Sequence, residues 1–178
     1  LRPELIADRD EVFAAISDDA VFLIDTMPEA HFQGAMAFYG RPGHIPGAIS
    51  IFDKDFDKLK DQLPADKSTP LVFYCGGVKC MLSHKSAFKA EKLGYTNIAV
   101  YAEGFPDWKE KGGLIAVPVS HVKAMMESGE PMVVVDSRPK KRQYDKGHIP
   151  GAISIPDTSF AQMTDRLPAD KGTPLYFY

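Results

Sequence analysis

The sequence GHIPGAISI occurs twice in this chain, at Gly43–Ile51 and at Gly147–Ile155, an offset of 104 residues. The sequence LPADK recurs at the same offset, at Leu63–Lys67 and Leu167–Lys171. A period of this length is that of a whole domain, because solenoids and propellers repeat at much shorter intervals. The repeat therefore predicts two copies of one domain within the 178 residues.

The second copy stops at Tyr178, one position before the counterpart of Cys75. We therefore expect a complete first domain over residues 1–113, with Lys111–Gly113 as the junction, and a partial second domain over residues 114–178 that lacks a cysteine loop. A half-domain of roughly 60 residues is short for a core that must hold by itself. Three outcomes are open: the native polypeptide continues, the tail is disordered, or a partner completes it. An unfinished sheet also exposes an edge, which predicts pairing into a homo-oligomer.

Composition excludes several partner classes. Hydrophobic residues at 44% and charged residues at 25% are ordinary for a soluble globular protein. The net charge is −3, and no basic tract is present that would attract nucleic acid or an anionic membrane. No apolar run approaches the roughly 20 residues that a membrane span needs. We therefore expect neither nucleic acid nor membrane as a partner, and the compartment stays open between cytoplasm and periplasm.

Short apolar runs alternate with helical patterns along the chain. Buried strands are predicted at residues 21–25, 71–74, 98–101 and 133–136. Helices are predicted from the shared faces of Val12, Phe13 and Ile16, of Phe52, Phe56, Leu59 and Leu63, of Phe105 and Trp108, and of Val122, Met125 and Met126 before Gly129. A further helix is expected between an N-cap at Ser83 and a stop at Gly94. This alternation predicts an α/β fold with a mainly parallel sheet flanked by helices.

The segment after the strand at 71–74 has the features of a reactive thiol site. Cys75 is expected at the carboxyl end of that strand, where α/β proteins bind ligands. Gly76 and Gly77 allow a tight loop whose N–H groups turn inward, and an amide nest at a helix start stabilises anions. Such a site lowers the pKa of a thiol from its usual ~8.5. Two cysteines five positions apart, Cys75 and Cys80, do not form a disulfide framework, so they indicate a reactive or redox pair.

The order of these motifs resembles the rhodanese family of sulfurtransferases. The residues that carry the resemblance are Asp25, Gly43–Ala48 with the sequence GHIPGA, Tyr74-Cys75, Gly94–Asn97 with the sequence GYTN, and Gly104 to Trp108. The likeness covers residues 5 to 111 and, as a truncated copy, roughly 117 to 178. It implies an α/β rhodanese-like domain that needs no cofactor and no metal.

The resemblance also implies a mechanism. In rhodaneses the loop cysteine takes a sulfane sulfur from a small anionic donor, becomes a persulfide, and passes the sulfur to cyanide, a thiol or a protein acceptor. By this resemblance Cys75 is the catalytic residue, and Lys79 attracts the donor. The persulfide would be stabilised by the loop amides of Gly76, Gly77, Val78, Lys79 and Cys80.

Two departures from the family pattern affect substrate and site. The spacing from Cys75 to Cys80 and Ser83, with Met81 where an arginine is common, resembles an extended-loop group of bacterial polysulfide-sulfur transferases, which puts a thiosulfate preference in doubt. Thr26-Met27-Pro28 follows Asp25, although the family usually has an arginine two places after that aspartate, as Arg138 is after Asp136. The first copy also carries seven extra residues within His31–Pro42, which either fold over the site or form an interface.

Several alternatives are open for the cysteines. Cys75 could be a buried structural thiol, and Cys80 a passive loop residue, a resolving thiol or a direct participant in sulfur transfer. Cys75, Cys80 and His84 could bind zinc. Oxyanion chemistry on phosphate or arsenate is disfavoured, because it needs an arginine six places after the cysteine. A sulfur- or redox-sensing or protein-interaction module could use the Cys75–Cys80 pair without turnover. Asp25, Trp108, His44 and His148 are expected to be structural.

Overall fold

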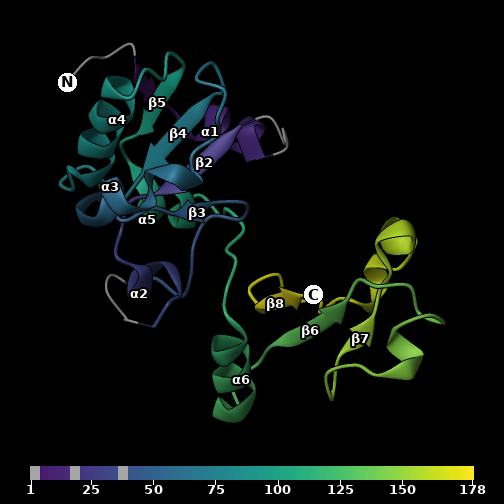
Figure 1. Ribbon diagram of the computed structural model, residues 1–178. Helices are drawn as coiled ribbons and strands as arrows, with labels where there is room; N and C mark the ends of the chain where they lie inside the picture. Colours follow the sequence, from purple (N-terminus) through teal and green to yellow (C-terminus); the bar gives the residue numbers. More distant parts are fainter. Residues whose placement is uncertain (1–4, 17–20, 36–39) are drawn as a thin grey trace. The chain divides into compact units, whose positions relative to one another are not determined.

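The computed structural model describes residues 5–16, 21–35 and 40–178, and it divides the chain into two compact units after Pro118 (Figure 1). The division falls five residues beyond the expected boundary at 113. The reason is that the segment after Gly113 is bound to unit 1. Gly113 donates a backbone hydrogen bond to Trp108 at 2.8 Å, and Ala116 forms an antiparallel bridge with His44.

Unit 1 is built on one five-stranded parallel sheet with the strand order β1-β5-β4-β2-β3. The strands are β1 (Ile6–Ala7), β2 (Phe22–Asp25), β3 (Ile49–Ser50), β4 (Leu71–Tyr74) and β5 (Ile98–Tyr101). The helices are α1 (Arg9–Ile16), α2 (Glu29–Phe32), α3 (Phe56–Leu59), α4 (Leu82–Lys92) and α5 (Gly104–Glu110), with short η3 (Asp53–Asp55) and η4 (Lys60–Gln62) around α3. This architecture confirms the predicted α/β fold with a parallel sheet.

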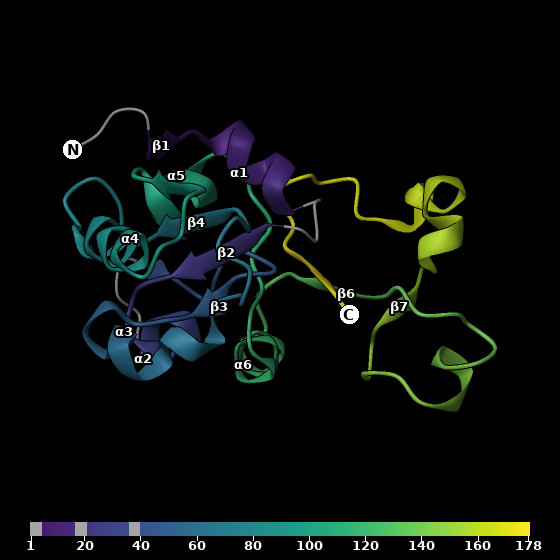
Figure 2. The same ribbon diagram turned by 45° about the horizontal axis from the view of Figure 1, so that its top comes forward.

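Alternating side chains of β4 fill two cores on opposite faces of the sheet. Val72 and Tyr74 belong to one cluster, which includes Trp108 of α5, whereas Leu71 and Phe73 belong to the other. The second cluster is completed by side chains of α3 and α4, among them Phe56, Ala87 and Ala90. Figure 2 shows α1 and α5 on one side of β2 and β4, with α3 on the opposite side. Because β4 is covered on both faces, it reads in sequence as a continuous apolar run.

Unit 2 repeats the first part of this plan. Its strands β6 (Val133–Asp136), β7 (Ile153–Ser154) and β8 (Leu175–Phe177) form a parallel sheet in the order β7-β6-β8. Helix α6 (Val119–Ser128) precedes them, and η5 (Tyr144–Lys146), η6 (Asp157–Gln162) and η7 (Thr164–Arg166) lie between them. The registers match between units, since Asp25 pairs with Ser50 and Asp136 pairs with Ser154.

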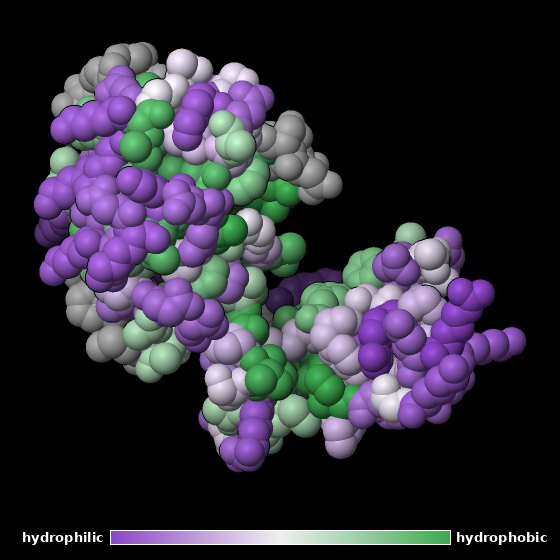
Figure 3. Space-filling view, viewed as in Figure 1, coloured by the Kyte–Doolittle hydropathy of each residue, from purple (hydrophilic) through white to green (hydrophobic). Residues whose placement is uncertain are grey.

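Three helix predictions were wrong in detail. Residues 52–63 form three consecutive short elements rather than one helix, although Phe56 and Leu63 are buried as expected. The side chain of Phe13 is 51% exposed instead of sharing the buried face of Val12. In α6 the expected apolar face is not buried. Hydrophilic residues predominate on the α3–α4 side of unit 1 (Figure 3). None of the helices within the described ranges is long and apolar enough to cross a membrane.

Candidate active site

Strand β4 delivers Cys75 to the carboxyl edge of the sheet, between β2 and β5. The loop that follows leads into α4, whose N-cap is Met81 and not Ser83 as predicted. Ser83 is instead buried in the first turn of α4, and its Oγ lies 3.3 Å from the Sγ of Cys75. Sequence reasoning missed this contact because the helix start was placed two residues too late.

The thiol of Cys75 has no exposed surface, but its neighbours are polar. Its Sγ lies 3.2 Å from the carbonyl oxygen of Cys80 and also forms a side-chain hydrogen bond with Cys80. The backbone N–H of Ser83 points to the same sulfur. The site is therefore buried without being apolar, which disfavours a purely structural thiol.

The hydrogen bonds of the site favour the thiolate form at Cys80. The hydrogen bond from Cys75 lowers the pKa of Cys80 to about 6, and the N–H groups of Leu82 and Gly76 add to this effect. The same hydrogen bond, together with burial, raises the pKa of Cys75. The predicted lowering of the thiol pKa is therefore found, but at Cys80 rather than at Cys75. The main reason is that Cys75 donates a hydrogen bond to Cys80, and the loop amides of Leu82 and Gly76 also face the second sulfur.

Cys80 is partly exposed, and its Sγ lies 4.0 Å from the Sδ of Met27. Met27 follows strand β2, so three sulfur atoms from two neighbouring strand ends gather at this edge of the sheet. Val78 and Lys79 lie exposed on the loop between the two cysteines. Of the predicted site residues, the structure thus brings Cys75, Cys80 and Gly76 together and places Val78 and Lys79 at the surface.

The backbone of the loop is fixed from α5. Phe105 donates its N–H to the carbonyl oxygen of Cys75 at 3.1 Å, and Cys80 donates to that of Gly77 at 2.8 Å. Gly104 has a φ of +61°, and a Cβ there would lie 2.4 Å from the carbonyl oxygen of Cys75. Only glycine allows this approach of α5 to the loop.

A buried arginine pairs with the aspartate at the end of β2, but it does not come from the expected position two places after Asp25. Arg41 forms an ion pair with the fully buried Asp25 and donates from Nε to the carbonyl oxygen of Gly43 at 2.7 Å. In unit 2, Arg138 pairs with Asp136 and bonds the equivalent carbonyl of Gly147 at 3.0 Å. Sequence reasoning missed Arg41, although it is the one arginine in His31–Pro42.

This finding bears on the extra residues of the first copy. Their last part supplies the guanidinium that the sequence lacks two places after Asp25, and residues 36–39 lie outside the described chain. Arg41 also lies over the rings of Tyr74 and Phe105, 5.8 Å and 4.5 Å from their centroids. Burial lowers the pKa of Arg41.

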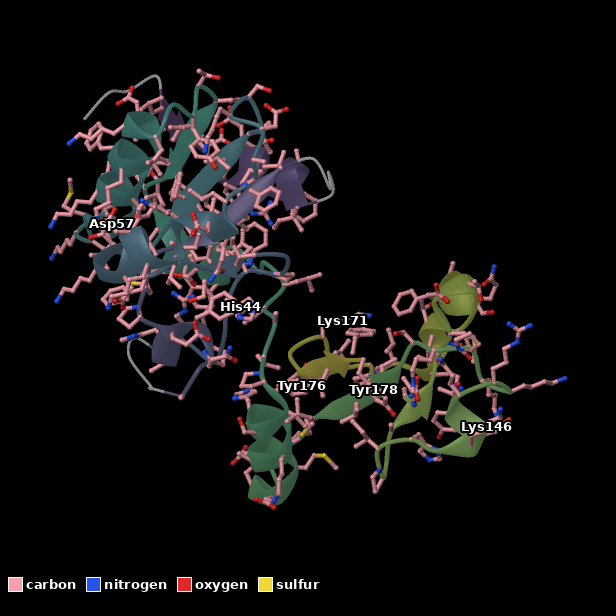
Figure 4. The ribbon with its side chains drawn as sticks, in the orientation of Figure 1. His44, Asp57, Lys146, Lys171, Tyr176 and Tyr178 are labelled. Atoms are coloured by element: carbon pink, nitrogen blue, oxygen red, sulfur yellow. The ribbon has the colours of Figure 1, made fainter. Side chains whose placement is uncertain are left out.

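The histidines of the repeated GHIPGA element are structural, as predicted. Nδ1 of His44 lies 3.0 Å from the carbonyl oxygen of Phe32, and the two rings stack at 3.7 Å. His148 makes the same pair of contacts with Tyr144, at 3.0 Å and 3.8 Å. Figure 4 shows His44 beside α2, and Tyr178 beyond Tyr176 of β8. The hydroxyl of Tyr178 accepts a hydrogen bond from the N–H of Ile149, as the hydroxyl of Tyr74 accepts one from Ile45.

The zinc alternative has no support in the geometry. Among the described residues, which include Cys75, Cys80 and His84, no three ligand side chains converge on a common metal position. Both ring nitrogens of His84 are buried without a hydrogen-bond partner in the described structure. Burial lowers the pKa of His84, so its ring is neutral.

Comparison with known proteins decides the family. The rhodanese-like domain matches residues 8–111 and again residues 119–178. The chain belongs to the rhodanese family. The repeated motif thus marks two rhodanese-like segments, and the resemblance noted in the sequence is confirmed.

Among curated relatives, the rhodanese chain is 32% identical over 125 residues to thiosulfate/3-mercaptopyruvate sulfurtransferase 2 of Arabidopsis thaliana, covering 60% of this chain and 35% of that protein. It is 31% identical over 134 residues to putative thiosulfate sulfurtransferase 1 of Mycobacterium bovis, covering 64% of this chain and 46% of that protein. The chain therefore spans less than half the length of these relatives.

Solved structures share the fold at lower identity. A persulfide form of an EanB variant with ergothioneine has a TM-score of 0.55 and 21% identity, covering 85% of this chain and 41% of that one. The Alr3790 protein from Anabaena has a TM-score of 0.52 and 18% identity, covering 68% of this chain and 90% of that one. These likenesses support the fold alone.

Proposed function

We propose that this rhodanese is a sulfurtransferase that carries sulfane sulfur as a persulfide on Cys75. The observation that carries the proposal is the placement of Cys75 at the carboxyl end of the central strand, where its sulfur forms hydrogen bonds with Ser83 and Cys80. The names of the curated relatives support the reaction class.

The chemistry requires two half-reactions of ping-pong type. In the first, a cysteine thiolate attacks the sulfane sulfur of the donor, and the rest of the donor leaves with the bonding electron pair. In the second, a nucleophilic acceptor attacks the outer sulfur and the Cys75 thiolate leaves. No external oxidant, reductant or cofactor is needed, because the sulfane sulfur is transferred without a net change in oxidation state. Cyanide, a low-molecular-weight thiol and a protein thiol all fit the acceptor role.

The loop favours a polysulfide over thiosulfate as donor. Thiosulfate carries a sulfonate head that a guanidinium binds in a bidentate manner, but loop residues 75–82 contain no arginine. Lys79 offers a single exposed cation instead, and a chain of sulfur atoms needs no fork-shaped partner. We therefore expect polysulfide to react faster than thiosulfate.

Mass spectrometry tests the proposal. After incubation with polysulfide or thiosulfate, the peptide that contains Cys75 should gain the mass of one sulfur atom and lose it on addition of cyanide. The Cys75→Ser variant should release thiocyanate well below the wild-type rate. Absence of added sulfur on Cys75 with both donors would remove the proposal.

The hydrogen-bonded thiol pair also supports a second candidate function. A domain that senses oxidants or sulfur would convert Cys75 and Cys80 into a reversible disulfide without turnover. Formation of a Cys75–Cys80 disulfide on treatment with peroxide, in a protein that forms almost no thiocyanate, would favour this role.

Homo-oligomer formation stays a prediction, and light scattering on the purified chain tests it.

A further inference from the structure

We propose that Cys80 takes the sulfane sulfur from the donor first and then passes it to Cys75. The inference rests on the proposed function and refines it, because it assigns the entry of sulfur and its storage to different residues. It gives Cys80 a catalytic role ahead of Cys75.

Accessibility is the first reason. Cys75 has no exposed surface, whereas Cys80 is partly exposed. The loop around Cys80 is exposed to solvent, since Val78, two positions before it, is 70% exposed and Met81, directly after it, is 46% exposed. A donor anion that reaches this loop therefore meets the sulfur of Cys80 before that of Cys75.

Nucleophilicity is the second reason. The backbone N–H groups of Leu82 and Gly76 point at Cys80, at the start of α4, where a thiolate is stabilised. The hydrogen bond from Cys75 and these amides lower the pKa of Cys80, which favours its thiolate form. The hydrogen bond with Cys80 and burial raise the pKa of Cys75, which favours its thiol form. Thiolate and not thiol is the attacking species in sulfur exchange.

The contact between the two sulfurs supplies the path for the second step. In the first step the thiolate of Cys80 attacks a sulfane sulfur of the polysulfide, the S–S bond of the donor breaks, and a shorter polysulfide anion leaves. In the second step the proton of Cys75 moves to the persulfide on Cys80, the Cys75 thiolate attacks the outer sulfur, and the bond between that sulfur and Cys80 breaks. Cys80 leaves as a thiolate with the electron pair, so atoms and charge balance without an oxidant.

Ser83 is placed to assist the acceptor of this relay. Its Oγ lies 3.3 Å from the Sγ of Cys75, and its N–H points to the same atom. Both groups can donate to Cys75 as it becomes anionic. Met27 keeps Cys80 at the edge of the site through its sulfur contact at 4.0 Å.

The sequence makes the test direct, because trypsin cleaves after Lys79 and separates Cys75 in residues 68–79 from Cys80 in residues 80–85. Protein mixed with tetrasulfide is quenched with an alkylating agent at increasing times, and the added sulfur is located by mass spectrometry. In the wild type we expect sulfur on Cys80 first and on Cys75 later. In Cys75→Ser the sulfur should accumulate on Cys80. In Cys80→Ser and Cys80→Ala the loading of Cys75 should slow at least about tenfold.

Two results separate this proposal from the proposed function. Loading of Cys75 at the wild-type rate in both Cys80 variants, with no sulfur on Cys80 in Cys75→Ser, overturns the relay and leaves the sulfurtransferase intact. No sulfur on either cysteine in the wild type overturns both. The wild-type time course needs no variant, and the pH dependence of iodoacetamide labelling gives a second readout. Cys80 should label first, with a midpoint near 6.

Discussion

Arg41 and Asp25 form an ion pair across a separation of 16 residues, with side chains that are 4% and 0% exposed. The equivalent pair in unit 2 joins residues two apart, Arg138 and Asp136. In both units a guanidinium group pairs with the aspartate at the strand end, but the arginine comes from a different position in the sequence. The end of β2, beside the cysteine loop, depends on a residue that no local motif predicts.

Replacing this arginine should destabilise unit 1. In Arg41→Met the carboxylate of Asp25 is left buried without its partner, which costs about 3–5 kcal/mol. Denaturant unfolding measures the loss. Lys58→Met is the control, because Lys58 pairs with Asp55 at the surface and should change the free energy of unfolding by less than about 1 kcal/mol. Equal losses in the two variants would contradict the structural role of Arg41.

Removing the Ser83 hydroxyl should raise the pKa of Cys75 further, since its hydrogen bond lowers that pKa. In Ser83→Ala we expect sulfur transfer to slow about three- to tenfold, the worth of one hydrogen bond, with the pH midpoint of the rate moved upward. Stopped-flow kinetics across pH measure both effects. Ser86→Ala is the matched control, because Ser86 is buried in the same helix but bonds Asp53 at 3.0 Å. An unshifted pH profile in Ser83→Ala would contradict the contact.

The approach of α5 to the loop predicts a glycine effect. In Gly104→Ala the new methyl group meets the carbonyl of Cys75, so the loop must move, and we expect sulfur loading of Cys75 to fall sharply. Gly94→Ala is the control: its φ is also positive, +91°, but nothing lies within 4 Å of its Cβ. It should lose about 1–2 kcal/mol of stability with normal loading. Similar loading in both variants would count against the fixed loop.

The pH dependence of unit 2 follows from Asp136. The hydrogen bond from Arg138 lowers the pKa of Asp136 to about 2, below the ~3.9 of an unfolded chain. This depressed pKa contributes stability that is fully present above pH ~4 and is lost as the pH falls toward 2. Arg138→Gln should raise the midpoint, which an NMR titration of the Asp136 carboxyl group detects. An unchanged midpoint would show that the arginine does not set it.

The sequence predicts the parts of this fold that local pattern controls. The apolar runs locate β2, β4, β5 and β6, because buried parallel strands leave a continuous signal. The repeat locates the GHIPGA element and its two histidines. The resemblance to the rhodanese family then predicts Cys75 as the catalytic residue.

Contacts between distant residues could not be predicted in this way. Arg41 reaches Asp25 only when the chain has folded back on β2, and Gly104 meets Cys75 only when α5 has docked. The opposite pKa shifts of Cys75 and Cys80 depend on the hydrogen bond between the two thiols and on which sulfur the N–H groups of Leu82 and Gly76 face. Residue types within the loop do not specify that direction.

The measurement that tests the account most directly follows one sulfur atom through Cys75. Protein loaded with isotopically labelled sulfane sulfur is freed of donor and mixed with cyanide, and thiocyanate and the modified Cys75 peptide are measured together. We predict that the label leaves Cys75 at the rate at which thiocyanate appears, and that Cys75→Ser forms thiocyanate well below the wild-type rate. Thiocyanate formed at the wild-type rate by Cys75→Ser, or label that stays on Cys75 as thiocyanate accumulates, would contradict the account.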